Sequence, residues 1–110
     1  MKFLFEHVSD QLNEIRHLIR HSAFFNAQSI LQSINSDLLT DEEKQTYSLL
    51  KVILLNRMGR YEQAISLCNE ILEKGIIKKN SAYQLDIVIE LANALKSRHQ
   101  YEDSLNKVEL

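Results

Sequence analysis

The chain has no proline and only two glycines in 110 residues, and this shortage of helix breakers constrains its fold more than any other feature. Proline and glycine are the residues that most destabilise a helix interior. Near the N-terminus, Val8, Leu12, Ile15, Leu18 and Ile19 recur at steps of three and four, which places them on one helix face. We predict an all-α fold of about six helices, near residues 5–21, 24–35, 41–58, 61–74, 82–98 and 101–110.

Two local motifs predict where the central helices begin and end. Thr40 and Glu43 have the spacing of a capping box, in which the hydroxyl and the carboxylate each accept a hydrogen bond from an orphan backbone amide. Gly75 follows the segment 61–74 and can adopt the left-handed conformation that closes a helix. A polar linker, IIKKNS at 76–81, then separates the fourth helix from the fifth.

Three segments can be aligned on an aromatic residue followed three positions later by a small one. They are HSAFFNAQSIL from residue 21, MGRYEQAISLC from residue 58 and RHQYEDSLNKV from residue 98. The paired positions are Phe24 with Ala27, Tyr61 with Ala64, and Tyr101 with Ser104. The small residues follow one another at spacings of 37 and 40 positions, which is typical of stacked helical hairpins.

The pattern suits two antiparallel helices joined by a tight turn. Gly59 permits the turn, Tyr61 would wedge between the helices, and Ala64 would let their backbones approach closely. Cys68 lies four residues further along the same face, so we expect it to be a small buried hydrophobe. A single cysteine cannot form an internal disulfide and suits a reducing compartment, which favours a cytoplasmic location.

At these residues the chain resembles the tetratricopeptide repeat (TPR) family, whose hairpins show the same glycine, aromatic and small-residue spacing. The third unit matches best, because Leu91, Ala92 and Leu95 supply the leucine, small residue and leucine of a first helix. The second unit departs from the family pattern at Lys51 and Val52, which stand at the leucine and small-residue positions.

The first unit matches least, with Ser22 at the glycine and Glu14 at the leucine, and the family's terminal proline is absent from all three. The resemblance implies a right-handed α-solenoid of three antiparallel hairpins forming one domain over residues 1–110. Its units would lie at about 5–38, 40–76 and 80–110, the last one incomplete.

The resemblance also implies a concave groove, lined by the first helix of each hairpin, that holds a peptide or helix of a protein partner. Its lining would be mixed, with an apolar middle, a basic end and an acidic end. The implied lining residues are Leu12, Asn13, Arg16, Arg20, Leu49, Leu50, Ile53, Asn56, Arg57, Asp86, Ile89, Glu90 and Asn93. Some family members clamp a partner's C-terminal carboxylate with lysine, asparagine and arginine. Here that clamp is lost, since the matching residues are Leu12, Arg16, Leu50, Asp86 and Glu90.

The third predicted helix is apolar almost all the way round its axis, which a helix open to water on one side does not need. Two interpretations are open, because these residues can belong to the core of a central helix or to the floor of the groove. They are Leu49, Leu50, Val52, Ile53, Leu54 and Leu55.

We expect neither catalysis nor a bound cofactor. A phosphate-binding loop cannot be made from two isolated glycines, and a buried Cys68 would be a poor nucleophile. Glu14, His17 and His21 share a helix face with metal-ligand spacing, but nothing nearby completes the coordination sphere, so we expect no metal.

The charge pattern and hydropathy also limit the classes of partner. The 13 basic and 15 acidic residues are mixed along the chain, whereas nucleic-acid binding needs a clustered basic face. We expect no membrane span or secretory signal, because no apolar run is long enough for either. Leu105, Val108 and Leu110 would have no following element to cover them. The alternative to groove binding is therefore a structural role, either homo-oligomerisation through the C-terminal end or an assembly domain that is a fragment of a larger TPR-containing regulator.

Overall fold

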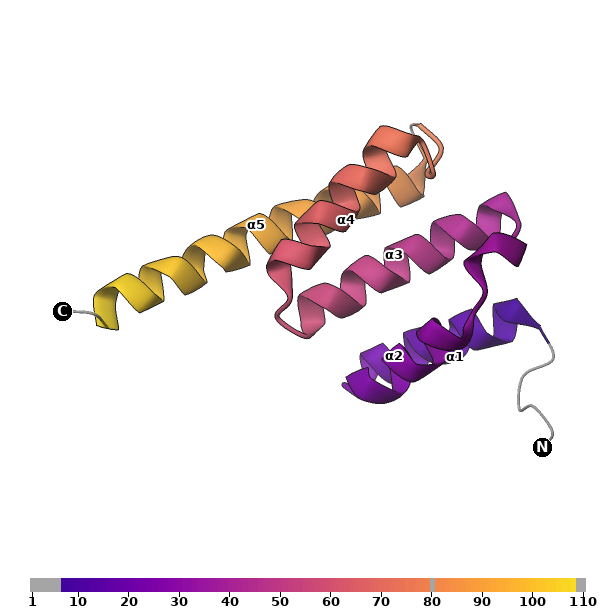
Figure 1. The fold of residues 1–110 in the computed structure, drawn as a ribbon, viewed down its shortest axis with the longest axis horizontal. Coiled ribbons are helices and arrows are strands. Elements are labelled where there is room, and N and C mark those ends of the chain that lie inside the picture. The colour runs from indigo at the N-terminus through magenta and orange to yellow at the C-terminus, as the bar shows by residue number, and fades with distance from the viewer. Residues whose placement is uncertain (1–6, 80, 109–110) are drawn as a thin grey trace.

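The computed structural model describes residues 7–79 and 81–108, and within them the chain is all-helical, as predicted (Figure 1). The elements are α1 (Val8–Arg20), α2 (Phe24–Ser33), the short 3₁₀ helix η1 (Ser36–Leu38), α3 (Asp41–Arg57), α4 (Tyr61–Lys74) and α5 (Ala82–Val108). The predicted bounds of the first four α-helices agree with these to within about three residues. Phe5 and Leu110 lie outside the described residues, as do the side chains of Ser104, Leu105 and Val108.

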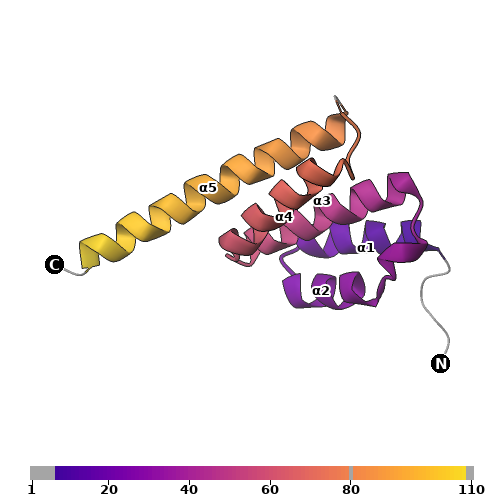
Figure 2. The same ribbon diagram turned by 45° about the horizontal axis from the view of Figure 1, so that its top comes forward.

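Helices α1 and α2 form one antiparallel hairpin and α3 and α4 form a second, as Figures 1 and 2 show. The turns that close them share one hydrogen-bond pattern. Ser22 has a φ of 63° and Gly59 a φ of 77°, and both are left-handed. The next residue donates its amide to the carbonyl five positions earlier, at 2.8 Å in the first turn and 2.9 Å in the second. This is the Schellman type of helix end, so the alignment of these two turns is confirmed.

The predicted start and end signals of the central helices are confirmed. The Thr40 hydroxyl accepts a hydrogen bond from the Glu43 amide at 3.2 Å, and the Glu43 carboxylate accepts one from the Thr40 amide at 2.9 Å. Gly75 ends α4 in the left-handed conformation, with a φ of 65°. The chain between the second hairpin and α5 is then held near α3, because the Lys78 amide donates to the Gln45 side chain at 3.1 Å.

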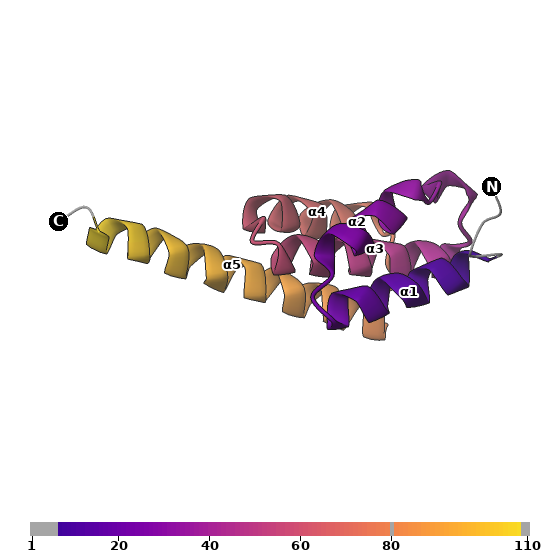
Figure 3. The ribbon, with the colours of Figure 1, turned by 90° about the horizontal axis from the view of Figure 1, so that it is seen from below.

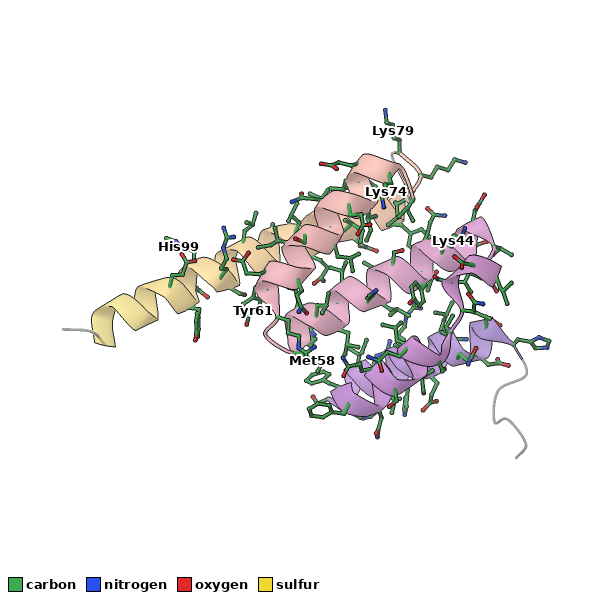
Figure 4. All side chains as sticks on the ribbon, in the orientation of Figure 1. Lys44, Met58, Tyr61, Lys74, Lys79 and His99 are labelled. Atoms are coloured by element: carbon green, nitrogen blue, oxygen red, sulfur yellow. The ribbon has the colours of Figure 1, made fainter. Side chains whose placement is uncertain are left out.

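The small residues of the first two repeats are fully buried. Ala27 and Ala64 have no exposed surface, and neither has Cys68, one turn beyond Ala64. Phe24 and Tyr61 are half-buried beside the turns, and Figure 4 shows Tyr61 next to the turn that joins α3 to α4. The predicted burial of these small residues in the first two hairpins is therefore confirmed.

Helix α3 contributes to two core clusters, one on each side of it. The first cluster contains Leu12, Ile15, Ala27, Leu31, Ile34, Leu39, Leu50 and Leu54. The second contains Leu49, Val52, Cys68, Ile71, Ile77 and Ile87. Most of the apolar surface of α3 is therefore core, because this helix packs against the first hairpin on one side and against α4 and α5 on the other.

The predicted turn at residues 98–101 is wrong, and so is the separate sixth helix. Helix α5 continues through His99 and Tyr101 to Val108, and its C-terminal part extends beyond both hairpins (Figure 2). His99 stands where Gly59 closes the second hairpin, and a bulky residue is less favourable in the left-handed conformation. Continuing the helix adds one backbone hydrogen bond per residue, which a turn at this point would interrupt.

The predicted burial of the third unit's pattern residues is also wrong. Ile87 and Ala94 are the fully buried residues of α5, whereas Ala92 is exposed and Leu95 is 40 % exposed. Tyr101 is 61 % exposed and does not form a wedge. Among the described residues the chain thus forms two hairpins and one long helix instead of three hairpins.

Candidate interaction groove

The first helices of the two hairpins and α5 form one layer of the molecule, and α2 and α4 form the other (Figure 3). Helices α1, α3 and α5 run in the same direction, with α3 in contact with both of its neighbours. This arrangement follows from the connections between the helices. Each hairpin turn takes the chain from the first layer to the second, and the next connection brings it back to the first layer. Side chains from α1 and α5 can therefore border a surface whose floor is α3.

A cavity of about 740 Å³ lies on this surface. Its floor is apolar, because Leu49 and Leu50 are buried there and Ile53 is half-buried beside them. Its lining residues are Arg16, Ile19, Arg20, Ser22, Phe24, Leu49, Leu50, Ile53, Arg57 and Asp86.

The cavity is electropositive. Arg16 and Arg20 come from α1 and Arg57 from the end of α3, and all three are exposed. Within the described part of the chain, none of these arginines is in a salt bridge, and Asp86 is the single acidic residue of the lining. An anionic group entering the cavity would therefore meet uncompensated positive charge next to an apolar floor.

A second cavity of about 370 Å³ shares Arg16 with the first, so the two form one groove, named here the α1–α3–α5 groove. Thr46 and Tyr83 line this second cavity, and their hydroxyl oxygens are hydrogen-bonded at 3.0 Å, which links α3 to α5. The remaining lining residues are Ser9, Leu12, Asn13, Thr40, Glu42 and Glu43. The glutamates make this end of the groove more acidic than the arginine end.

Nine of the predicted groove residues line this groove and four do not. Those that line it are Leu12, Asn13, Arg16, Arg20, Leu49, Leu50, Ile53, Arg57 and Asp86. Those that do not are Asn56, Ile89, Glu90 and Asn93. The acidic end predicted on α5 is thus reduced to Asp86, and the partner-binding role of all these residues stays a prediction.

Asn56 and Glu90 bind each other. The Asn56 Nδ2 donates to the Glu90 Oε1 at 2.8 Å and to the Glu90 backbone carbonyl at 3.1 Å, which ties α3 to α5. The Asn56 Oδ1 is buried and has no hydrogen-bond partner in the structure. These two side chains therefore join α3 to α5 and do not line the groove.

Sequence reasoning missed several lining residues. Thr46 lies one turn before Leu50 on the same face of α3, so helical periodicity could have identified it. Tyr83 lies on α5 one turn before Ile87, which is fully buried, but its bond to Thr46 joins residues far apart in sequence. No local signal identifies a contact of that kind.

The chemistry-bearing side chains outside the groove do not form a reactive cluster. The rings of His17 and His21 lie 4.4 Å apart between centroids, and the described residues contain no group of three metal-ligating side chains. Burial, with a smaller effect of the Glu90 carboxylate, raises the pKa of the Cys68 thiol to about 11. This thiol is protonated at neutral pH, and the thiolate is the nucleophilic form.

Comparison with family models, curated proteins and solved structures finds no match to this chain. None of the helices in residues 7–79 and 81–108 is long and apolar enough to cross a membrane.

Proposed function

We propose that the chain is a protein-interaction module that holds a peptide or helix of a partner protein in the α1–α3–α5 groove. The observation that carries this proposal is the juxtaposition of Arg16, Arg20 and Arg57 with the apolar floor formed by Leu49 and Ile53. An apolar floor can supply affinity through burial, and arginines at its rim select the sign and position of charge on the ligand. The groove is built from packed helices, so binding requires little ordering of the receptor.

The proposed fold family is TPR-like. Two hairpins would be followed by α5 at the place of a third unit's first helix, in a right-handed α-solenoid. The matching turns at Ser22 and Gly59 and the buried Ala27 and Ala64 support this assignment. We further propose that the module acts in the cytoplasm, where a free buried thiol such as Cys68 stays reduced.

The ligand that fits this groove is an amphipathic helix or an extended peptide. Its apolar side would lie on Ile53, its acidic end beside Arg20 and Arg57, and its basic end toward Glu42 in the second cavity. Arginine binds carboxylates bidentately, so aspartate or glutamate side chains suit the arginine end. A nucleic acid is a less suitable ligand, because the acidic second cavity would repel a continuous phosphate backbone.

Co-purification with mass spectrometry identifies the partner, and fluorescence anisotropy with its labelled segment then measures the affinity. We expect Ile53→Ser to weaken binding by roughly 1 to 3 kcal/mol, because it removes an apolar anchor. Arg16→Glu should mainly slow association and reduce its dependence on salt. Phe25→Ser is the matched control, since Phe25 is 76 % exposed and lies on α2 in the other layer.

Each variant must keep the helical circular dichroism of the wild type for the comparison to count. If the folded double variant of Ile53 and Arg16 binds with unaltered affinity, the groove is not the binding site. In that case the α2–α4 layer becomes the surface to test.

A further inference from the structure

The outer face of α5 carries a stripe of exposed apolar side chains. The stripe consists of Leu85, Val88, Ile89, Ala92 and Leu95, and is named here the α5 stripe. Leu85 is 61 % exposed, Val88 and Ile89 are 46 % exposed, and Leu95 is 40 % exposed. None of the five residues lines the α1–α3–α5 groove.

The α5 stripe lies opposite the face that joins α5 to the rest of the chain. Ile87 and Ala94 are fully buried and seven positions apart, so they mark the inner face. Leu85, Val88 and Ala92 are separated by three and then four residues, and Leu95 follows three residues later. This is the spacing of a coiled-coil seam, which calls for a helix as the covering element.

The repeat alignment indicates independently that a helix belongs on this face. Ala92 aligns with Ile15 and Val52, at the repeat spacings of 37 and 40 residues, and both of these residues are fully buried. Ile89 aligns in the same way with Leu12 and Leu49, which are 5 % and 6 % exposed. The positions that are covered in the first two units are exposed in α5, because residues 101–108 continue this helix and do not fold back onto it.

The side-chain sizes along the stripe are self-complementary in one orientation. If two copies of α5 pair in antiparallel fashion about a two-fold axis level with residue 90, Leu85 lies opposite Leu95, and Val88 lies opposite Ala92. Each contact then occurs twice, as a two-fold interface requires. A parallel pair in register would place Ala92 against Ala92 and leave a gap.

The charges along α5 favour the same orientation. Asp86 lines the groove and takes no part in this pairing, so the relevant charges are those near the two ends of α5 in an antiparallel pair. Glu102 then reaches the level of the turn that carries Lys78 and Lys79, which are both exposed. A parallel pair would oppose like charges at these positions, which is unfavourable.

We propose that two copies of this chain associate through the α5 stripe, with their α5 helices antiparallel. The pairing covers Leu85, Val88, Ala92 and Leu95 and leaves the cavity floor at Ile53 free. This proposal does not depend on whether a ligand binds in the groove.

Sedimentation equilibrium over a concentration series tests the association. We expect the apparent mass of the wild type to rise from 12.8 kDa toward twice that value. Val88→Glu and Leu95→Glu should each weaken the dimer at least about tenfold, because they place a charge in the seam. Phe25→Glu, which changes an exposed apolar residue on α2, should leave it unchanged.

Two results would overturn the proposal. One is a wild type that stays monomeric up to millimolar concentration, which would mean that no second copy occupies the stripe. The other is a dimer that persists in both folded α5 variants, which would place the interface on another face. Because Val88 and Leu95 are exposed, both variants are expected to keep wild-type helicity.

Disulfide cross-linking tests the orientation. Ile89 lies almost on the two-fold axis, so Ile89→Cys should form a cross-linked dimer under mild oxidation. In the antiparallel pair the two copies of residue 85 are ten helical positions apart, or about 15 Å along the axis, so Leu85→Cys should not cross-link. Cross-linking of Leu85→Cys with no reaction of Ile89→Cys would refute the antiparallel arrangement. The wild type controls for Cys68, which is buried.

Discussion

Replacing Ile87 by alanine should destabilise the fold far more than replacing Leu95, although sequence periodicity alone places Leu95 in the core. Ile87 is fully buried in the cluster that joins α3, α4 and α5. The change removes three carbon atoms, which corresponds to about 2.5 kcal/mol of transfer free energy at about 0.8 kcal/mol each. A cavity term adds to this, so we expect a total loss within the range of about 2 to 5 kcal/mol.

Leu95→Ala is the matched control on the same helix. Because Leu95 is 40 % exposed, part of its apolar surface already faces water, and we expect a loss of only about 1.5 kcal/mol or less. Urea denaturation followed by far-ultraviolet circular dichroism measures both free energies of unfolding, at dilute concentration so that self-association does not contribute. Equal losses for the two variants, or a larger loss for Leu95→Ala, would show that Leu95 lies in the core, and would refute this reasoning.

Three further changes probe the hairpins and the core by the same denaturation assay. Ala64→Leu should overpack a fully buried contact point and cost about 1 to 3 kcal/mol, whereas Gln63→Leu on the exposed side of α4 should cost little. Gly59→Ala should lower the stability by about 1 kcal/mol. The left-handed φ of 77° is the only cause, because an added methyl group meets nothing within 4 Å. A variant as stable as the wild type would refute that reasoning. Burial and Glu90 raise the pKa of Cys68 to about 11 from an ordinary value of 9.0, so the folded state binds more protons than the unfolded state between these values. The stability of the wild type should therefore fall on the order of 2 to 3 kcal/mol relative to Cys68→Ala as pH rises from about 9 to about 11, and parallel pH profiles would contradict this.

The features that could be predicted from the sequence are those determined within one or two helical turns. The capping box of Thr40 and Glu43 and the left-handed Gly75 depend on residues at most a few positions apart. The burial of Ala27 and Ala64 follows from a pattern that repeats with each hairpin. Such local signals are consistent with the final structure, and they predict four of the five α-helices well.

The features that could not be predicted depend on competition between distant parts of the chain. Residues 98–101 carry an aromatic signal that resembles the earlier hairpins, but the sequence does not show how much surface a sixth helix would bury. The pair of Asn56 and Glu90 is a second case, because these residues look like groove-lining side chains until the packing of α3 on α5 brings them together. Most of the groove was predictable nevertheless, since aligned positions on first helices face the same side.

The missing turn at His99 and the exposed α5 stripe have one physical cause. Folding residues 101–108 back onto α5 would end the helix early, leave its last carbonyl groups without helical partners and put a non-glycine residue in the left-handed conformation. A second α5 covers the same stripe without breaking any backbone hydrogen bond, and its cost is the entropy of association, which falls in importance as concentration rises. Ile15 and Val52 are fully buried in clusters to which the second helix of their own hairpin contributes, and each hairpin is closed by a left-handed residue, at position 22 or 59. Ala92 aligns with them, but the described part of α5 continues to Val108 without such a turn, and in the proposed dimer a second α5 covers it instead.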